Sequence, residues 1–218
     1  MSFNSLPSIF GLFLTLSSLG FGQTGEALKV SPEVAAHDFV EVTELVPGII
    51  VYLPYATESN FFKKRFYKAN RCFLRRAVAE KLALVQQDLK VSGLGIKIWD
   101  GYRPRSVQWE FWKVMPNPDY VADPKLGSRH NRGAAVDITL VDLKTGKELV
   151  MPTAHDDFTP KAASDFSMLP VEALQNRTLL HVAMKKRGFS PLPSEWWHFD
   201  ADGWEAYPLE DFEPLEAK

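Results

Sequence analysis

The chain is organised around the stretch SRHNRGAAVD, residues 128–137, together with the short stretch EWWH, residues 195–198. Two histidines and one carboxylate are enough for a catalytic zinc site, which takes three protein ligands and leaves the fourth position to water. A hydrolytic site also needs a free carboxylate close to one ligand as general base, and Glu195, three residues before His198, is placed for that role. The two stretches therefore indicate a hydrolytic zinc site, and we interpret the remaining chain as its scaffold, substrate pocket and export signal.

The composition is that of an ordinary globular protein. The 218 residues are enough for one domain with a sizeable core, and the hydrophobic content of 45% and charged content of 24% are unexceptional. A net charge of −2 gives no indication of a nucleic-acid-binding surface. Because Cys72 is the single cysteine, an intrachain disulfide framework is excluded, and we expect Cys72 to be a small buried residue.

The N-terminal segment favours export. The apolar run from Ile9 to Gly22 is too short and too rich in glycine and serine for a membrane span, and it ends in small residues. We expect residues 1–22 to be a signal peptide and residues 23–218 a single domain, with no stable membrane insertion after cleavage and a periplasmic or secreted location. Residues 1–8 lack lysine and arginine, so a buried N-terminal helix in a cytoplasmic protein is the alternative.

Hydrophobic periodicity predicts one domain of the α+β class. Strands are expected where residues alternate or β-branched residues cluster, at 39–45, 49–53, 95–100, 134–140, 148–151 and 196–199. Helices are expected at 75–91, 106–115 and 172–187, and long loops at 116–124 and 152–170. Because short turns join most strand-rich segments, and no internal repeat or linker is seen, we expect an antiparallel sheet packed with helices.

His130 and His198 differ from the other histidines in their sequence neighbours. We expect His37 and His181 to be ordinary surface or core residues, whereas His130 lies in a loop that enters a strand and His198 follows two tryptophans that would exclude water. Residues three apart in a regular strand point to opposite faces. Glu195 therefore has to precede the strand, or lie at a bulge, if it faces the same metal as His198.

Several motifs resemble those of the VanX-type D-alanyl-D-alanine dipeptidases, zinc enzymes with the hedgehog-like D,D-peptidase fold. The resemblance extends from about Phe39 to Tyr207. It rests on S-x-H-x-x-G-x-A-x-D at 128–137 with E-x-x-H at 195–198, on WDGYRP at 99–104, on YAT with NF at 55–61, and on NR followed by GF at 176–189.

The resemblance implies roles for five residues. His130, Asp137 and His198 would be the ligands of one Zn²⁺ per chain, and Glu195 the catalytic base and acid. Arg103 would contact the scissile carbonyl oxygen, and a surface salt bridge is the alternative for this residue. These roles agree with the chemistry, because zinc lowers the pKa of bound water to about 7 and a cation beside it stabilises the oxyanion.

The loop segment MPTAHDDF, residues 151–158, resembles the family segment whose aspartate holds the substrate ammonium group. Asp156 is the matching position, and Asp157 remains open as an alternative. Pro152 and His155 depart from the family pattern, in which glycine and an aromatic residue are usual, and a contact of His155 with the metal is a further alternative. Ser128 and Tyr55 are further candidates for substrate contacts, and the alternative is that either hydroxyl stabilises a turn or fills the core.

Three functions remain open on the sequence. The first is a zinc dipeptidase that cleaves D-alanyl-D-alanine, either for D-alanine salvage from the cell wall or in a glycopeptide response. The second is a zinc D,D-carboxypeptidase or muropeptide endopeptidase, which would need an open groove without a buried acid at Asp156 or Asp157. The third is a non-catalytic zinc domain that binds wall peptides, which the presence of Glu195 and Arg103 disfavours. The oligomeric state stays open.

Overall fold

A computed structural model describes Met1 and residues 38–118 and 120–213. The expected signal peptide and most of the polar segment that follows it lie outside these residues. Within them, no helix is both long and apolar enough to cross a membrane. The described elements, in chain order, are β1 (Phe39–Glu41), α2 (Val42–Leu45), β2 (Ile50–Val51), η1 (Pro54–Ala56), β3 (Phe73–Arg75), α3 (Arg76–Lys90), β4 (Leu94–Asp100), α4 (Arg105–Val114), η2 (His130–Arg132), β5 (Ala135–Asp142), η3 (Pro160–Ala162), α5 (Val171–Lys186), β6 (Phe189–Leu192), β7 (Glu195–Ala201) and η4 (Trp204–Ala206).

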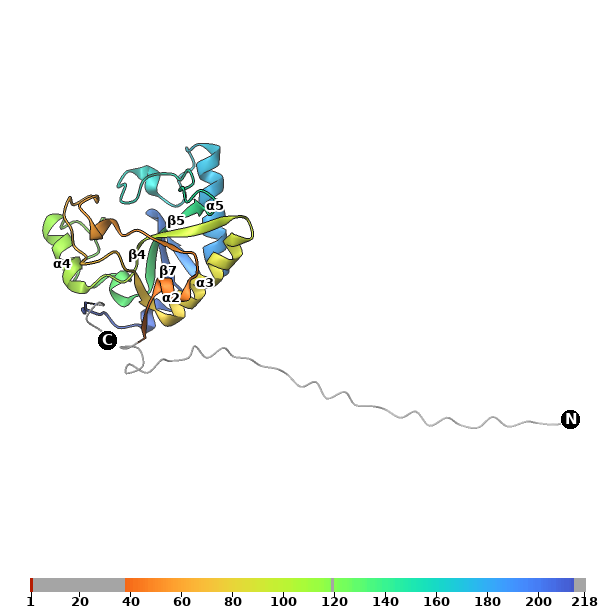
Figure 1. Cartoon of the computed structure of the whole chain (residues 1–218), viewed down its shortest axis with the longest axis horizontal. Helices are drawn as coiled ribbons and strands as arrows, with labels where there is room; N and C mark the ends of the chain where they lie inside the picture. Colours follow the sequence, from red (N-terminus) through yellow and green to blue (C-terminus); the bar gives the residue numbers. More distant parts are fainter. Residues whose placement is uncertain (2–37, 119, 214–218) are drawn as a thin grey trace.

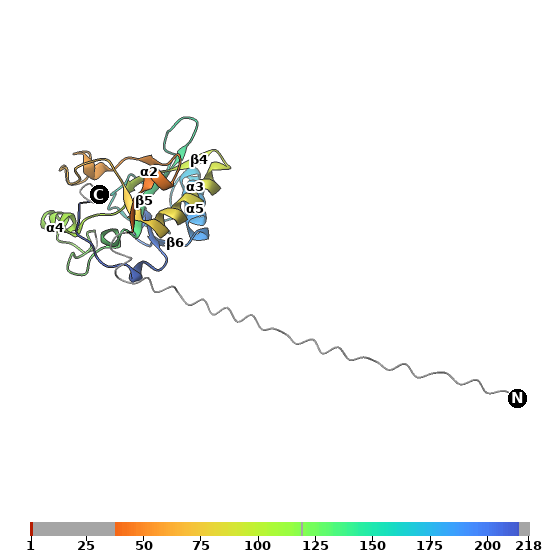
Figure 2. The same ribbon diagram turned by 60° about the horizontal axis from the view of Figure 1, so that its bottom comes forward.

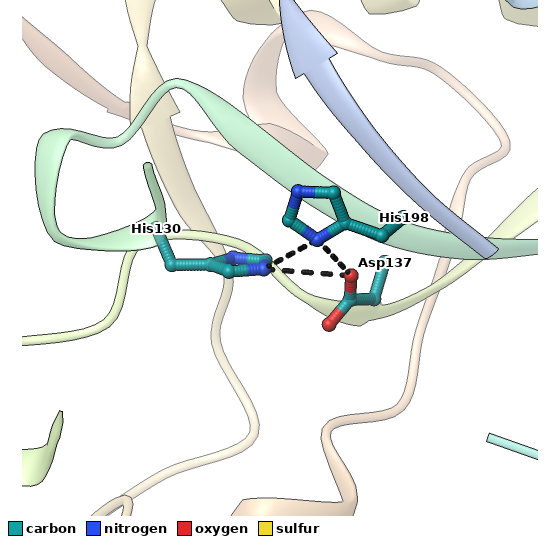
Figure 3. A group of neighbouring side chains, drawn as sticks. All are labelled: His130, Asp137 and His198. Carbon is teal, nitrogen blue, oxygen red and sulfur yellow. Dashed lines mark hydrogen bonds and ion pairs between the residues drawn. The ribbon is translucent and has the colours of Figure 1, made fainter. Parts of the chain in front are cut away.

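A five-stranded sheet in the order β2-β4-β5-β7-β6 forms the centre of the molecule, and β1 and β3 form a separate antiparallel pair. The α+β prediction is confirmed, with one addition to the expected antiparallel sheet: the edge strand β2 pairs in parallel with β4. The central strand β5 and its neighbour β7 place the site, because Asp137 of β5 lies directly opposite His198 of β7 (Figure 3).

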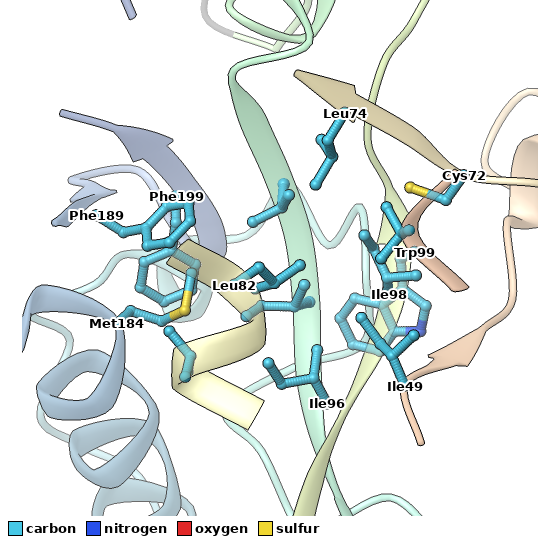
Figure 4. Packing of buried hydrophobic residues seen from close by; sticks show 14 of the residues in the cluster. Ile49, Cys72, Leu74, Leu82, Ile96, Ile98, Trp99, Met184, Phe189 and Phe199 are labelled. Atoms are coloured by element: carbon cyan, nitrogen blue, oxygen red, sulfur yellow. The ribbon is translucent and has the colours of Figure 1, made fainter. Parts of the chain in front are cut away.

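Helices α3 and α5 lie side by side against one face of the sheet, while α4 lies on the far side of the molecule from them (Figures 1 and 2). Side chains alternate between the faces of a strand, so Val136, Ile138 and Leu140 of β5 point into the core and Asp137 points away from it. Figure 4 shows this core, in which Leu82 of α3 packs with residues of the sheet and of α5. The helices thus cover and stabilise one face of the sheet and leave the other face free to carry the functional site.

The three long helices begin and end within one residue of the predicted bounds, but the strand predicted at 39–45 is partly wrong. Its first three residues form β1, and the chain then turns into the short helix α2. The fully buried Val42 and Val46 lie four residues apart, which is a helical spacing, and the apparent alternation of the segment hides this pair. The strand predicted at 148–151 is reduced to one isolated bridge between Val141 and Glu148.

Two short strands, β3 and β6, are absent from the sequence-based prediction. β3 has three residues, and β6 contains Pro191, which favours a loop. Both are formed by pairing with distant segments, β3 with β1 and β6 with β7. In the β6–β7 ladder the pair Pro191–Phe199 is followed by the pair Leu192–Glu195, so β7 bulges between Glu195 and Phe199. This irregularity is the one expected if Glu195 and His198 face the same side.

Candidate active site

Three buried side chains converge on the open face of the sheet. His130 from η2, Asp137 from β5 and His198 from β7 bring their donor atoms within 4.8 Å of one another (Figure 3). His198 Nδ1 lies 2.9 Å from Asp137 Oδ1, and His130 Nε2 lies 3.1 Å from His198 Nδ1 and 3.4 Å from Asp137 Oδ1. Two nitrogens and one oxygen at these separations fit a catalytic zinc site with three protein ligands.

The loop that carries His130 is fixed by its own sequence. Asn131 donates from Nδ2 to the Arg103 carbonyl, 2.8 Å away, and its Oδ1 accepts from the Ser128 backbone at 2.7 Å. Gly133 ends η2 with φ +66°, a conformation that favours glycine, and a Cβ there would lie 2.3 Å from the ring of Phe39. The H-x-x-G spacing is therefore a requirement of the backbone that places His130.

Each of the two histidines is oriented by a partner on its other nitrogen. His130 Nδ1 lies 2.8 Å from the Gly101 carbonyl, which accepts only, so Nδ1 carries the proton and Nε2 is left for the metal. His198 uses the opposite arrangement, with Nε2 2.9 Å from Asp200 Oδ1 and Nδ1 facing Asp137 and His130, where it could bind a metal. Such outer partners fix ring orientation and tautomer in metal sites.

The electrostatics of the cluster favour a cation. Burial lowers the pKa of His198, but hydrogen bonds with Asp137 and Asp200 more than offset this and raise it to about 10. Burial raises the pKa of Asp137, but His130 and then the hydrogen bonds from His155 and His198 hold it well below its ordinary value. The same carboxylates that attract a proton would attract a divalent metal ion.

Glu195 stands beside this group at the start of β7. Its Oε2 lies 4.0 Å from His198 Nδ1, and its side chain lines the same pocket as the three converging residues. Burial raises the pKa of its carboxyl above the ordinary value, and the nearby His198 offsets only part of that effect. A carboxylate with a raised pKa next to a metal position is suited to accept and return a proton.

Arg103 is buried and held from two sides. Its Nε and Nη2 donate to Asp100 Oδ2 at 3.0 and 2.6 Å, and its Nη1 donates to Gln108 Oε1 at 2.8 Å. The guanidinium also lies over the ring of Phe111, 4.7 Å from its centroid. Arg103 lines the pocket, so the alternative of a surface salt bridge is wrong: its ion pair with Asp100 is buried.

Asp156 enters the pocket from the long loop. Tyr55 donates from its hydroxyl to the Asp156 carboxylate, at 2.8 Å from Oδ2 and 3.1 Å from Oδ1. Asp156 has φ +57°, an uncommon conformation for a residue with a side chain. Asp157 instead accepts from the Thr159 backbone at 2.8 Å. Between the two aspartates left open by the sequence, Asp156 is the one that lines the catalytic pocket.

The pocket has a volume of about 230 Å³, and all eight residues expected at the site line it. Ser128 is among them, and its Oγ accepts from the His130 backbone at 3.2 Å, so this hydroxyl also stabilises the loop.

Sequence reasoning missed Asp200 and Asp100. Asp200 follows His198 by two residues on the same strand, and this spacing, which places both on one face, is the signal that could have found it.

The chain is similar to known proteins over most of its length. Residues 35–212 match the family model of the peptidase M15 D-ala-D-ala dipeptidases. The D-alanyl-D-alanine dipeptidase of Escherichia coli K12 is 35% identical over 172 residues, covering 79% of this chain and 89% of that protein. The Streptomyces coelicolor protein of the same name is 34% identical, covering 74% and 90%. A solved structure of the vancomycin-resistance D,D-pentapeptidase VanY with Zn(II) is similar with TM-score 0.39 and 17% identity, covering 64% of this chain and 79% of that one.

Proposed function

Because the chain belongs to the peptidase M15 family of D-alanyl-D-alanine dipeptidases, we propose that it hydrolyses the dipeptide D-alanyl-D-alanine to two D-alanines with one zinc ion. The observation that carries the proposal is the convergence of three metal-binding side chains, Glu195 and Arg103 in one small pocket. His130, Asp137 and His198 would hold the zinc. When bound, zinc lowers the pKa of water and polarises the scissile carbonyl.

The residues around the metal position divide the chemistry among them. Glu195 takes a proton from the attacking water and delivers it to the nitrogen of the leaving D-alanine as the C–N bond breaks. Arg103 donates a hydrogen bond to the carbonyl oxygen as negative charge develops on it, and its bonds to Asp100 and Gln108 keep it in place. Water and one peptide bond are consumed, and one carboxylate and one amine are formed.

Asp156 is the residue that would make the site prefer a free dipeptide as substrate. A free dipeptide presents an ammonium group on the residue before the scissile bond, and the Asp156 carboxylate, held by Tyr55, provides the opposite charge. A longer wall peptide would present an uncharged amide there and would leave a carboxylate unpaired in the pocket. The geometry therefore favours the dipeptidase over a carboxypeptidase or endopeptidase.

Metal depletion and restoration tests the proposal. Purified protein is stripped with a chelator and assayed for D-alanine release from D-alanyl-D-alanine before and after addition of one equivalent of Zn²⁺. We expect activity to disappear and to return, and we expect His130→Ala to bind no stoichiometric zinc and to remain inactive. Full activity in the stripped protein, or stoichiometric zinc in His130→Ala, would contradict the proposed metal site.

A further inference from the structure

His155 lies in the wall of the site. Its side chain is 8% exposed, and its ring stacks on Trp99 with centroids 5.0 Å apart and an interplanar angle of 29°. Tyr55 and Trp197 also meet this ring in T-shaped contacts, with centroids 5.9 and 5.7 Å away. Packing alone would be satisfied by any flat aromatic ring, so it does not explain a histidine.

The imidazole Nε2 lies between two carboxylates that have different proposed tasks. It is 3.4 Å from Asp137 Oδ2 and 3.5 Å from Asp156 Oδ1. Asp137 Oδ1, the other oxygen of that carboxylate, faces His198 and His130. Since carboxylates only accept, the proton belongs on His155 Nε2, from which it is donated to Asp137, while the Asp156 carboxylate lies within ion-pair distance of the same nitrogen.

We propose that His155 is a positioning residue whose Nε2–H links the Asp137 carboxylate at the zinc position to the Asp156 carboxylate at the substrate ammonium position. The inference rests on the proposed function and deepens it. By holding Oδ2, His155 keeps Oδ1 of Asp137 turned toward His198 and His130, with which it would hold the metal. By contacting Asp156 together with the Tyr55 hydroxyl, it keeps that carboxylate in place although Asp156 has a strained backbone conformation.

Two substitutions separate this role from packing. His155→Phe keeps the flat ring against Trp99 and removes the nitrogen. His155→Gln loses the ring and places an amide N–H near the position of Nε2. The matched control is His181→Phe on α5, since His181 is a half-buried histidine whose Nε2 lies 3.0 Å from the Trp196 carbonyl and whose ring meets Phe199 edge-on.

The readout is the dissociation constant of Zn²⁺, measured by competition with a chromophoric chelator on proteins whose metal-free melting curves show that they are folded. We expect His155→Phe to bind zinc about 10–100-fold more weakly, as is usual when an outer partner of a ligand is lost. His155→Gln should recover most of that loss, and His181→Phe should match the wild type. In steady-state assays, His155→Phe should also raise KM for the free dipeptide.

The inference fails if folded His155→Phe binds zinc within twofold of the wild type with an unchanged KM, because the ring is then only packing. It also fails if His155→Gln binds zinc as poorly as His155→Phe, because the Nε2–H is then not what matters. The zinc titration needs no turnover, so failure of this inference can be distinguished from failure of the proposed function. A wild type that binds zinc and hydrolyses the dipeptide, beside a His155→Phe variant that binds zinc as tightly with an unchanged KM, removes this inference and leaves the proposed function standing.

Discussion

The surroundings of two carboxylates of the pocket, Asp137 and Glu195, shift their pKa values in opposite directions. Burial raises the pKa of both, but at Asp137 the histidines around it reverse the effect and hold the pKa well below its ordinary value. At Glu195 burial prevails, and the pKa is raised. Neighbouring acids whose pKa values are separated in this way divide tasks, so the permanently charged Asp137 suits a metal and Glu195 suits proton transfer.

Replacement of Glu195 by alanine tests that division. Because Glu195 is not among the three converging metal-binding side chains, Glu195→Ala should keep one zinc per chain. Its turnover of D-alanyl-D-alanine should fall by at least about 10²-fold, the usual contribution of a positioned acid–base. Metal analysis and D-alanine release on the same preparation give both quantities. Unchanged turnover would remove Glu195 from the mechanism.

For single residues, the sequence predicts the central groups of the site and misses their supports. Arg103, His130, Asp137 and His198 belong to ordered motifs, so the family resemblance alone locates them. The pairing of His130 with the Gly101 carbonyl, and the position of His155 between two carboxylates, depend on how distant loops fold together. The spacing of residues within a short sequence segment does not predict such contacts.

Among the elements, η2 is the one on which the site depends most closely. It carries His130, and Gly133 ends it in a left-handed conformation against Phe39. The predicted helices are correct because each has enough turns for its apolar period to be read. The short strands β3 and β6 escape prediction because three or four residues carry no such period, and pairing with distant partners decides their structure.

Gly133→Ala should destabilise the protein beyond the cost of its backbone conformation. A non-glycine residue with this φ costs about 1–3 kcal/mol, and the new Cβ would also meet the Phe39 ring. Gly146→Ala is the control, because Gly146 has φ +69° and no atom of the described residues lies within 4 Å of its Cβ position. Urea denaturation of the metal-free proteins should show the larger loss for Gly133→Ala. Equal losses would mean that the contact with Phe39 does not matter.

The link between α3 and α5 predicts a pH-dependent contribution to stability. Asp88 on α3 accepts from Arg187, just beyond α5, at 2.8 Å, and Lys186 lies 3.0 Å away. Hydrogen bonds from Arg187 and Lys186 lower the pKa of Asp88 from 3.8 to about 2. Since the folded pKa is depressed, the contribution is complete above about pH 4 and is lost as the pH falls toward 2.

Asp88→Asn should therefore lower the melting temperature slightly at pH 7, and the difference from the wild type should shrink as the pH falls below 4. The effect should also be smaller in high salt, because the pair is partly exposed to solvent. Glu80→Gln on the exposed side of the same helix is the control. A difference that is constant between pH 7 and pH 3 would show that the ion pair contributes nothing.

In the molecule as a whole, α3 and α5 cover one face of the sheet (Figures 1 and 2), Asp137 points from the other face, and loops from distant parts of the chain line the pocket. A second cluster of buried aromatic and aliphatic side chains, Tyr55, Phe111 and Val121, forms part of the pocket wall. The small volume of the pocket suits a small substrate and agrees with the proposed dipeptide.

We propose that the protein acts outside the cytoplasm, on the basis of the apolar run from Ile9 to Gly22 and the small residues at its end. Fractionation of producing cells should then find the protein in the periplasm or medium, with a mature N-terminus near Gln23. Deletion of residues 2–22 should leave the protein inside the cell with its activity intact. A cytoplasmic protein that retains Met1 or Ser2 would overturn this proposal.

A zinc dipeptidase of the proposed kind must read the free ammonium group of its substrate. We would measure D-alanine release by the zinc-loaded protein from D-alanyl-D-alanine and, in parallel, from its N-acetylated form, with Asp156→Asn as the matched variant. We expect release from the free dipeptide alone, and a loss of that activity in Asp156→Asn. Release from the acetylated peptide at an equal or higher rate would contradict the proposed function and would identify a carboxypeptidase instead.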